Sequence, residues 1–166
     1  MIHNLINAEV RLWFGREDCP VRDLVGYIER VGFLRDAQIE AIKTYLFLKI
    51  VGANRPLWRV ISDGLLARNE DLTSLRMSEK ARSTLATNRS ARALFEFTRA
   101  KTGNGGNGKT LMPELENHLL DRAPDLDCDQ ILKRLFYGGE YPDYLFSLPM
   151  GAGKTYLMAA FIYLDL

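Results

Sequence analysis

The sequence predicts a mainly α-helical chain that ends in one strand, a loop and a helix. Two observations support this fold class. Apolar residues recur at helical spacing between Gly and Pro residues over most of the chain, whereas its last residues read YLFSLPMGAGKTYLMAAFIYLDL. In that ending, a short apolar run precedes a glycine-rich loop and a stretch without Gly or Pro. With 166 residues, of which 47% are hydrophobic, the chain is long enough to bury a core.

An N-terminal helical segment is predicted over residues 1–52. The run Asp18-Cys-Pro20 is a helix start signal, and the apolar face that follows it before Gly32 consists of Leu24, Val25, Ile28 and Val31. A second helix is predicted from about Asp36 to Val51, because apolar residues recur there at helical spacing and a Gly follows.

A helical insertion is predicted over residues 53–140. Its first part is mixed in character and indicates a loop or a short helical turn, whereas residues 73–101 have a helical pattern with a break near Asn88. Another helix is expected after Pro113, and Asp127-Cys-Asp-Gln130 is a capping box for a further helix that a Gly-Gly pair ends.

One stretch of the insertion matches the general phosphate-loop pattern G-x-x-x-x-G-K-[ST]. It runs from Gly103 to Thr110, with Lys109 as the lysine of the pattern. The segment before it is helix-like rather than strand-like, and Pro113 falls in what would be the first turns of the phosphate-binding helix. Residues 102–110 are therefore predicted to be a flexible Gly/Asn linker, with a nucleotide site as the alternative.

The last segment, residues 141–166, is predicted to be the first strand, phosphate-binding loop and helix of an α/β unit. Tyr144–Leu148 has the apolar and aromatic character of a buried strand. Lys154–Leu166 is rich in Ala, Leu and Met and has the character of a helix that is covered on several sides. The alternative is that GAGKT is a chance loop without a ligand.

The chemistry of this loop follows from four residues. Gly151 and Gly153 let the backbone turn tightly and direct successive N–H groups at one point, where the start of the following helix adds partial positive charge. Lys154 can then reach the β- and γ-phosphates of a nucleotide, and the Thr155 hydroxyl can bind Mg²⁺. The general pattern also asks for an earlier Gly, where this chain has Leu148.

The run LPMGAGKT resembles motif I of the superfamily-two helicases and translocases, x-P-T-G-[ST]-G-K-T, which lacks that early Gly. Met150 stands where this family has Thr, and Ala152 where it has Ser or Thr. The resemblance implies a RecA-like ATPase domain, ATP and Mg²⁺ as ligands, and nucleotide contacts from Met150, Gly151, Ala152, Gly153, Lys154 and Thr155.

The run FLRDAQIEAI, residues 33–42, resembles the Q-type motif that superfamily-two proteins carry upstream of motif I, often as L-R-x-x-Q-x-x-A. Arg35, Gln38 and Ala41 match it. An amide offers one donor and one acceptor in a plane, which is complementary to adenine N6 and N7, so Gln38 is predicted to read ATP over GTP together with Arg35. The alternative is an ordinary helix start with a Gln that faces solvent.

The insertion separates the two motifs by many more residues than the few tens found in common helicases. This arrangement is similar to the Res subunits of type III restriction enzymes. The resemblance implies a motor of a restriction system that acts on DNA in its full-length form, with a modification or specificity subunit as a possible partner.

Charge is polarised within the insertion. Basic residues predominate over residues 75–102, and acidic residues predominate over residues 114–143. The basic half could lie on a DNA backbone, since phosphate contacts need Lys and Arg at a surface. Equally, the two halves could neutralise each other as packed helices.

Composition indicates a cytoplasmic location. The formal net charge of +1 implies no global attraction to nucleic acid, and the two cysteines are far apart, which suits a reducing compartment. His3 and His118 are expected at the surface. A secretory segment is absent from the sequence, and the apolar tail is too short to span a bilayer, so no membrane association is expected.

The sequence is therefore interpreted as the N-terminal portion of an ATP-dependent DNA helicase or translocase. In this family the acid that holds Mg²⁺ and the strands that flank the first strand lie downstream of motif I, and the chain ends one helix after the loop. Whether these residues alone are an enzyme stays open, because those parts are missing. The alternative is a non-catalytic helical interaction or regulatory module with a vestigial loop.

Overall fold

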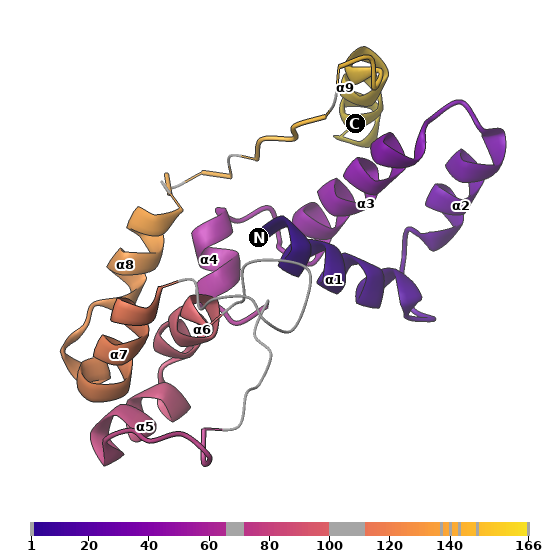
Figure 1. Cartoon of the computed structure of the whole chain (residues 1–166). Helices are drawn as coiled ribbons and strands as arrows, with labels where there is room; N and C mark the ends of the chain where they lie inside the picture. Colours follow the sequence, from indigo (N-terminus) through magenta and orange to yellow (C-terminus); the bar gives the residue numbers. More distant parts are fainter. Residues whose placement is uncertain are drawn as a thin grey trace. The chain divides into compact units, whose positions relative to one another are not determined.

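The computed structural model describes residues 2–65, 72–99, 112–136, 138–139, 141–142, 144–148 and 150–165. The prediction of a mainly α-helical chain is confirmed, and the described residues form no β-strand (Figure 1). The helices are α1 (Ile2–Gly15), α2 (Arg22–Val31), α3 (Asp36–Ile50), α4 (Leu57–Ser62), α5 (Glu79–Thr87), α6 (Arg89–Thr98), α7 (Pro113–Arg122), the 3₁₀ turn η1 (Ala123–Asp125), α8 (Cys128–Leu135) and α9 (Lys154–Asp165).

The chain divides into two compact units. One unit, Pro56–Asp143, is continuous in sequence and is called the insertion unit below. The other joins Ile2–Arg55 to Tyr144–Leu166 and is called the split unit. The boundaries between them lie close to those proposed for the helical insertion, residues 53–140.

The insertion unit is built around α6, which contacts α4, α5, α7 and α8. Its core consists of side chains that are almost fully removed from solvent: Val60, Leu85, Leu94, Phe95, Thr98, Leu119 and Leu132. The predicted break near Asn88 is confirmed. Asn88 ends α5 and begins α6, and its side-chain oxygen accepts a hydrogen bond from the N–H of Ala91 at 3.0 Å.

The ends of the insertion unit are tied to each other through Trp58. The indole N–H donates to the carbonyl of Gly139 at 3.1 Å, so the first and last parts of the unit lie side by side. The cationic groups of Arg59 and Lys133 lie 5.0 and 5.6 Å from the centre of the Trp58 ring. The predicted cap of α8 is also present, since Asp127 accepts from the N–H of Gln130 at 3.0 Å.

The split unit is built around α3, which contacts α1, α2 and α9. The predicted bounds of α3 and the predicted end of α2 are confirmed, whereas α2 begins at Arg22, after the predicted start signal at Asp18-Cys-Pro20. The apolar face predicted for α2 is not buried as a whole, since Val25 is buried but Leu24 and Val31 are 39% and 41% exposed. Gly32, with φ of 73°, ends α2 in the left-handed conformation that favours glycine, and α3 begins at Asp36. Helix α1 was not predicted as a separate element, although Ile6, Val10 and Trp13 are buried at helical spacing.

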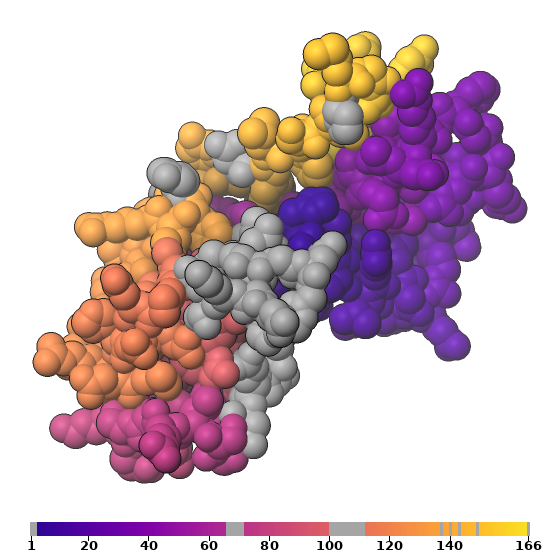
Figure 2. Space-filling model, viewed as in Figure 1, coloured from indigo at the N-terminus to yellow at the C-terminus, as the bar shows by residue number. Residues whose placement is uncertain are grey.

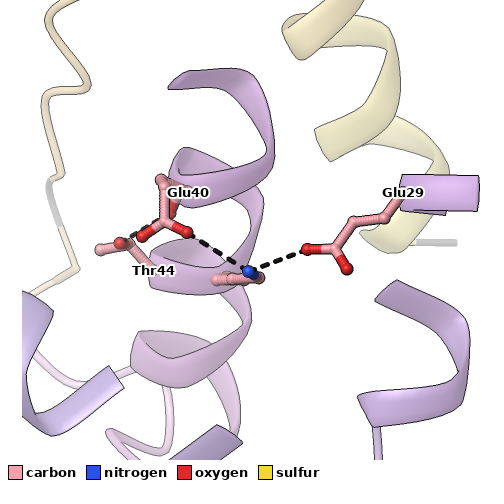
Figure 3. A network of polar contacts seen from close by, with 4 residues as sticks. Glu29, Glu40 and Thr44 are labelled. Atoms are coloured by element: carbon pink, nitrogen blue, oxygen red, sulfur yellow. Dashed lines mark hydrogen bonds and ion pairs between the residues drawn. The ribbon is translucent and has the colours of Figure 1, made fainter. Parts of the chain in front are cut away.

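A charged side chain joins α2 to α3 (Figure 3). Lys43 of α3 lies between two carboxylates, with its Nζ 2.9 Å from Glu29 of α2 and 3.2 Å from Glu40 of its own helix. Burial opposes the positive charge, but hydrogen bonds and attraction from both carboxylates outweigh it and raise the pKa of Lys43. Lys43 therefore stays charged and helps to fix α2 on α3.

The strand expected at Tyr144–Leu148 is not formed among the described residues. A strand requires a neighbour with which to form a hydrogen-bonded ladder, and no described segment provides one. Side-chain packing still holds the segment in the split unit. The ring of Phe146 lies 5.1 Å from that of Phe161 of α9 and 6.5 Å from that of Tyr45 of α3, whereas Leu145 is 94% exposed.

Helix α9 is covered on only one of its apolar sides. Leu157 is buried, and the rings of Phe161 and Tyr45 stack 4.4 Å apart, where α9 meets α3. Four other large apolar side chains of α9 are exposed: Tyr156, Met158, Ile162 and Tyr163. These four side chains belong to the segment that is drawn in yellow in the space-filling view (Figure 2). In the described part of the chain, no helix is both long and apolar enough to cross a membrane.

Candidate functional site

The loop of residues 150–153, directly before α9, contains two glycines in the left-handed conformation. Gly151 and Gly153 have φ of 75° and 72°, a region that side chains with a Cβ rarely adopt. Helix α9 begins directly after them, at Lys154. Within the described part of the chain, the backbone N–H groups of residues 151–155 donate to no backbone carbonyl. These N–H groups and the start of the helix together can receive a phosphate.

Two side chains from the start of α3 bind the carbonyls of this loop. Arg35 Nη1 donates to the carbonyl of Gly151 at 2.8 Å, and Gln38 Nε2 donates to the carbonyl of Gly153 at 2.7 Å. The residues of each pair are 116 and 115 positions apart in the sequence. The structure therefore brings the two predicted motifs together, although the whole insertion unit lies between them in the sequence.

Local helix chemistry fixes the orientation of Gln38. Its Oε1 accepts a hydrogen bond from the backbone N–H of Arg35 at 2.8 Å, the arrangement of a residue in the first turn that caps the helix start. The same amide then has its NH₂ group directed at the loop. Gln38 is 2% exposed, so its amide faces the loop carbonyl and not solvent.

Gly153 is required by two independent features. Its φ of 72° is strained for any other residue, and a Cβ built there would lie 2.7 Å from Nε2 of Gln38. The carbonyl of Gly153 also accepts the N–H of Tyr156 and of Leu157, at 3.1 and 3.3 Å, which begins α9. Through these hydrogen bonds, the carbonyl of Gly153 connects the loop to the first turn of α9 and to α3.

The remaining predicted site residues differ in exposure. Lys154 and Thr155 are exposed in the first turn of α9. There the Lys154 ammonium can reach an anion, and the Thr155 hydroxyl can reach a cation bound to that anion. Ala152 is buried and anchors the loop against the split unit. Met150 is 99% exposed, so its side chain contributes no packing to the loop.

The donor set of the loop could receive a phosphate group. The loop offers backbone N–H groups, a lysine ammonium and a hydroxyl, and no acidic residue lies within the run from Met150 to Thr155. No group of three or more His, Cys, Asp or Glu side chains that could hold a metal occurs among the described residues. A cation at Thr155 would therefore be held through the phosphates of the nucleotide.

One exposed aromatic residue, close in sequence to Arg35, was not singled out from the sequence. Phe33 lies two residues before Arg35 and is 89% exposed. An exposed ring offers a face on which a base can stack. The signal was the aromatic residue that begins the run FLRDAQIEAI, on a loop between two helices.

The second Gly-Lys-Thr sequence, with Lys109, lies outside the described residues, as does the whole predicted linker at 102–110. The structure therefore does not test that interpretation.

The two histidines are exposed as expected, and His3 lies 3.1 Å from the Asn7 amide. Burial, with added repulsion from Asp129 and Asp127, raises the pKa of the Cys128 thiol to about 11, so this cysteine is not a nucleophile at neutral pH.

The basic half of the insertion unit is partly neutralised. Arg99, which directly follows α6, lies 3.6 Å from Glu116 of α7 and joins the basic half to the acidic half. Arg92 lies 2.6 Å from Glu96 within α6. A pocket of about 300 Å³ is lined by Arg89 and Arg92 but also by Asp63. Its mixed charge does not mark a phosphate site. These contacts favour packing of oppositely charged helices over a DNA-binding face.

Comparison with known proteins gives no match to a protein-family model, a curated protein or a solved structure.

Proposed function

We propose that this chain binds ATP with Mg²⁺ at residues 150–155 and is part of an ATP-dependent superfamily-two helicase or translocase that acts on DNA. The observation that carries the proposal is the contact of Arg35 and Gln38 with the carbonyls of Gly151 and Gly153. Two stretches that each resemble a motif of this family meet at one loop. If GAGKT were a chance loop, contact with the second motif would not be expected.

The phosphates are proposed to bind at the first turn of α9. The N–H groups of residues 151–155 and the Lys154 ammonium stabilise their negative charge. Thr155 is the residue proposed to hold Mg²⁺, which when bound offsets the charge of the β- and γ-phosphates. The exposed ring of Phe33 is proposed to support the base.

Gln38 is proposed to act chiefly by positioning the loop. Both polar atoms of its amide are engaged within the protein, one by Arg35 and the other by Gly153. An amide that is 2% exposed has little surface to offer to adenine in this arrangement. The hydrogen bonds instead hold the Gly153 carbonyl away from the phosphate site and leave the N–H groups free to bind.

The Gln38→Ala variant separates loop positioning from base reading. We expect it to weaken binding of ATP, GTP and inorganic tripolyphosphate by the same factor, about 5- to 15-fold, because a lost hydrogen bond is worth about 1–1.5 kcal/mol. Isothermal titration calorimetry with each ligand and Mg²⁺ measures this. Gln130→Ala is the matched control, since this exposed Gln lies in the insertion unit. A loss confined to ATP would instead assign Gln38 to the adenine.

Nucleotide turnover by the 166-residue chain is not expected. The acid nearest the loop on its C-terminal side is Asp165, and it forms an ion pair with Lys49 at the far end of α9. Hydrolysis requires an acid near the cation and a group that orients water. A phosphate-release assay should therefore give the background rate with ATP and Mg²⁺, and release that Lys154→Ala abolishes would contradict this.

The second candidate function is a non-catalytic helical interaction or regulatory module with a vestigial loop. The exposed apolar side chains of α9 favour it, because such a patch is typical of an interaction surface. Nucleotide binding distinguishes the candidates. A module with a vestigial loop should bind neither ATP nor tripolyphosphate, and a restriction motor that also contacts a modification or specificity subunit should bind both.

A further inference from the structure

Helix α2 carries an apolar stripe that faces away from α3. Val25 is buried against the split unit, and Glu29 forms an ion pair with Lys43 of α3, so these two residues define the inner side of α2 (Figure 3). Tyr27 is two residues from each of them, which is a rotation of about 200° around a helix. Its ring therefore lies on the outer side, and it is 62% exposed.

Two aliphatic side chains extend the stripe to both ends of α2. Leu24 and Val31 are 39% and 41% exposed and lie about one turn before and after Tyr27 on the same side. The stripe thus has the spacing by which one helix packs along another. In Figure 1, α2 lies at the edge of the split unit.

Two opposite charges flank the stripe along one edge. Asp23 and Arg30 are exposed and lie about two turns apart, near the two ends of the helix. Arg30 donates to the carbonyl of Gly26 in its own helix at 3.2 Å. Neither charge forms an ion pair with any residue that the structure describes. The edge of the stripe thus carries one unpaired acid and one unpaired base.

This pattern is complementary to itself. When two identical helices pair antiparallel about a two-fold axis through their middle, each edge of the stripe meets the same edge of the other copy. Asp23 then lies opposite Arg30 of the second copy, twice, and Leu24 lies opposite Val31 of the second copy. The two Tyr27 rings meet at the axis. Every charge gains an opposite partner, and every apolar residue of the stripe is covered.

We propose that the stripe of Leu24, Tyr27 and Val31 is an interaction surface whose partner is α2 of a second copy of this chain, in antiparallel orientation. The inference is independent of the proposed nucleotide site. A contact made by a ten-residue helix buries less area than a standard interface of about 1,600 Å², so the dimer is weak and reversible. Its ion pairs are exposed, so higher salt loosens it.

Charge reversal tests the orientation. In the full chain, Asp23→Arg and Arg30→Asp should each weaken self-association about tenfold, because two attractive pairs become two repulsive ones. The double variant with both changes should recover the association of the original chain. Sedimentation equilibrium over a range of protein concentrations measures the dissociation constant, and circular dichroism confirms that each variant is folded.

Helix stability provides the opposite expectation for the double variant. Each reversal places the wrong charge at one end of the α2 dipole. If the variants acted only by destabilising α2, the double variant should therefore have the weakest self-association of all. Rescue therefore reports pairing between copies. Glu17→Arg is the control, because this exposed acid lies outside α2 and its reversal should leave association unchanged.

Three results would overturn the proposal. One is a chain that stays monomeric at every concentration, and another is a dimer that both single reversals leave unchanged. The third is a double variant that associates no better than the single ones, since this contradicts antiparallel pairing. Tyr27→Arg gives a second route to the same decision, because it puts two arginines at the axis and should abolish the dimer.

Discussion

The Lys154→Ala variant should lose most of the affinity of the chain for ATP and Mg²⁺. Lys154 is exposed in the first turn of α9, directly after the loop whose backbone N–H groups are proposed to bind phosphate. A hydrogen bond to a charged group is worth about 1.5–3 kcal/mol, so the dissociation constant should rise about 10- to 150-fold. Isothermal titration calorimetry with ATP and with tripolyphosphate should give the same loss, since Lys154 is proposed to contact phosphate alone.

Lys109→Ala is the matched control for this prediction. It removes the same group from the other Gly-Lys-Thr sequence, which satisfies the general pattern more completely but lies before a Pro that opens α7. Its affinity for ATP should equal that of the original chain. The reverse outcome, with binding lost in Lys109→Ala and kept in Lys154→Ala, would remove the loop at 150–155 from consideration and the family interpretation with it.

The helices could be predicted from the sequence where residues act locally. The start of α3 at Asp36, the end of α2 at Gly32 and the break at Asn88 depend on caps and backbone preferences within one turn. Helix α1 ends at Gly15, but no acidic residue marks its first turn. Its buried residues, among them Val10 and Trp13, did carry a helical period, which on its own was not sufficient to set its bounds.

The strand could not be predicted in the same way. The alternating exposure of Tyr144–Leu148 is real, with Leu145 open to solvent and Phe146 packed on α3 and α9. A ladder of hydrogen bonds depends on a second strand, however, and this is a property of the whole fold. An apolar run reports that one face is buried and does not report that a neighbour is present.

The contact between the two motifs agrees with the sequence, whereas the direction of the side chains that make it could not be predicted. The meeting of Gln38 with Gly153 follows the expectation that the two motifs belong to one site. The Gln38 amide points toward a loop carbonyl because it also accepts a hydrogen bond from the backbone N–H of Arg35. The sequence alone does not specify this hydrogen bond. The motif L-R-x-x-Q-x-x-A does not include the position of Phe33, and the exposure of its ring is what makes Phe33 a candidate.

The two compact units each have a core, which predicts two separable unfolding transitions. The core of the insertion unit centres on α6, where Phe95 is 0% exposed, and that of the split unit centres on α3, where Ile42 is 0% exposed. The loop proposed to bind phosphate and both side chains that bind its carbonyls belong to the split unit. Nucleotide should therefore stabilise only one of the transitions, since a ligand stabilises the unit that binds it.

Phe95→Ala should unfold the insertion unit and leave ATP binding intact. Removal of a buried Phe side chain costs about 3–5 kcal/mol, a large share of the usual 5–15 kcal/mol stability of a domain. Ile42→Ala is the converse control, because a cavity in α3 should weaken the split unit and ATP binding with it. Differential scanning calorimetry with and without ATP and Mg²⁺ separates the transitions. If Phe95→Ala abolished ATP binding as completely as Ile42→Ala, the two units would be one cooperative domain, and the insertion would be a structural part of the nucleotide site.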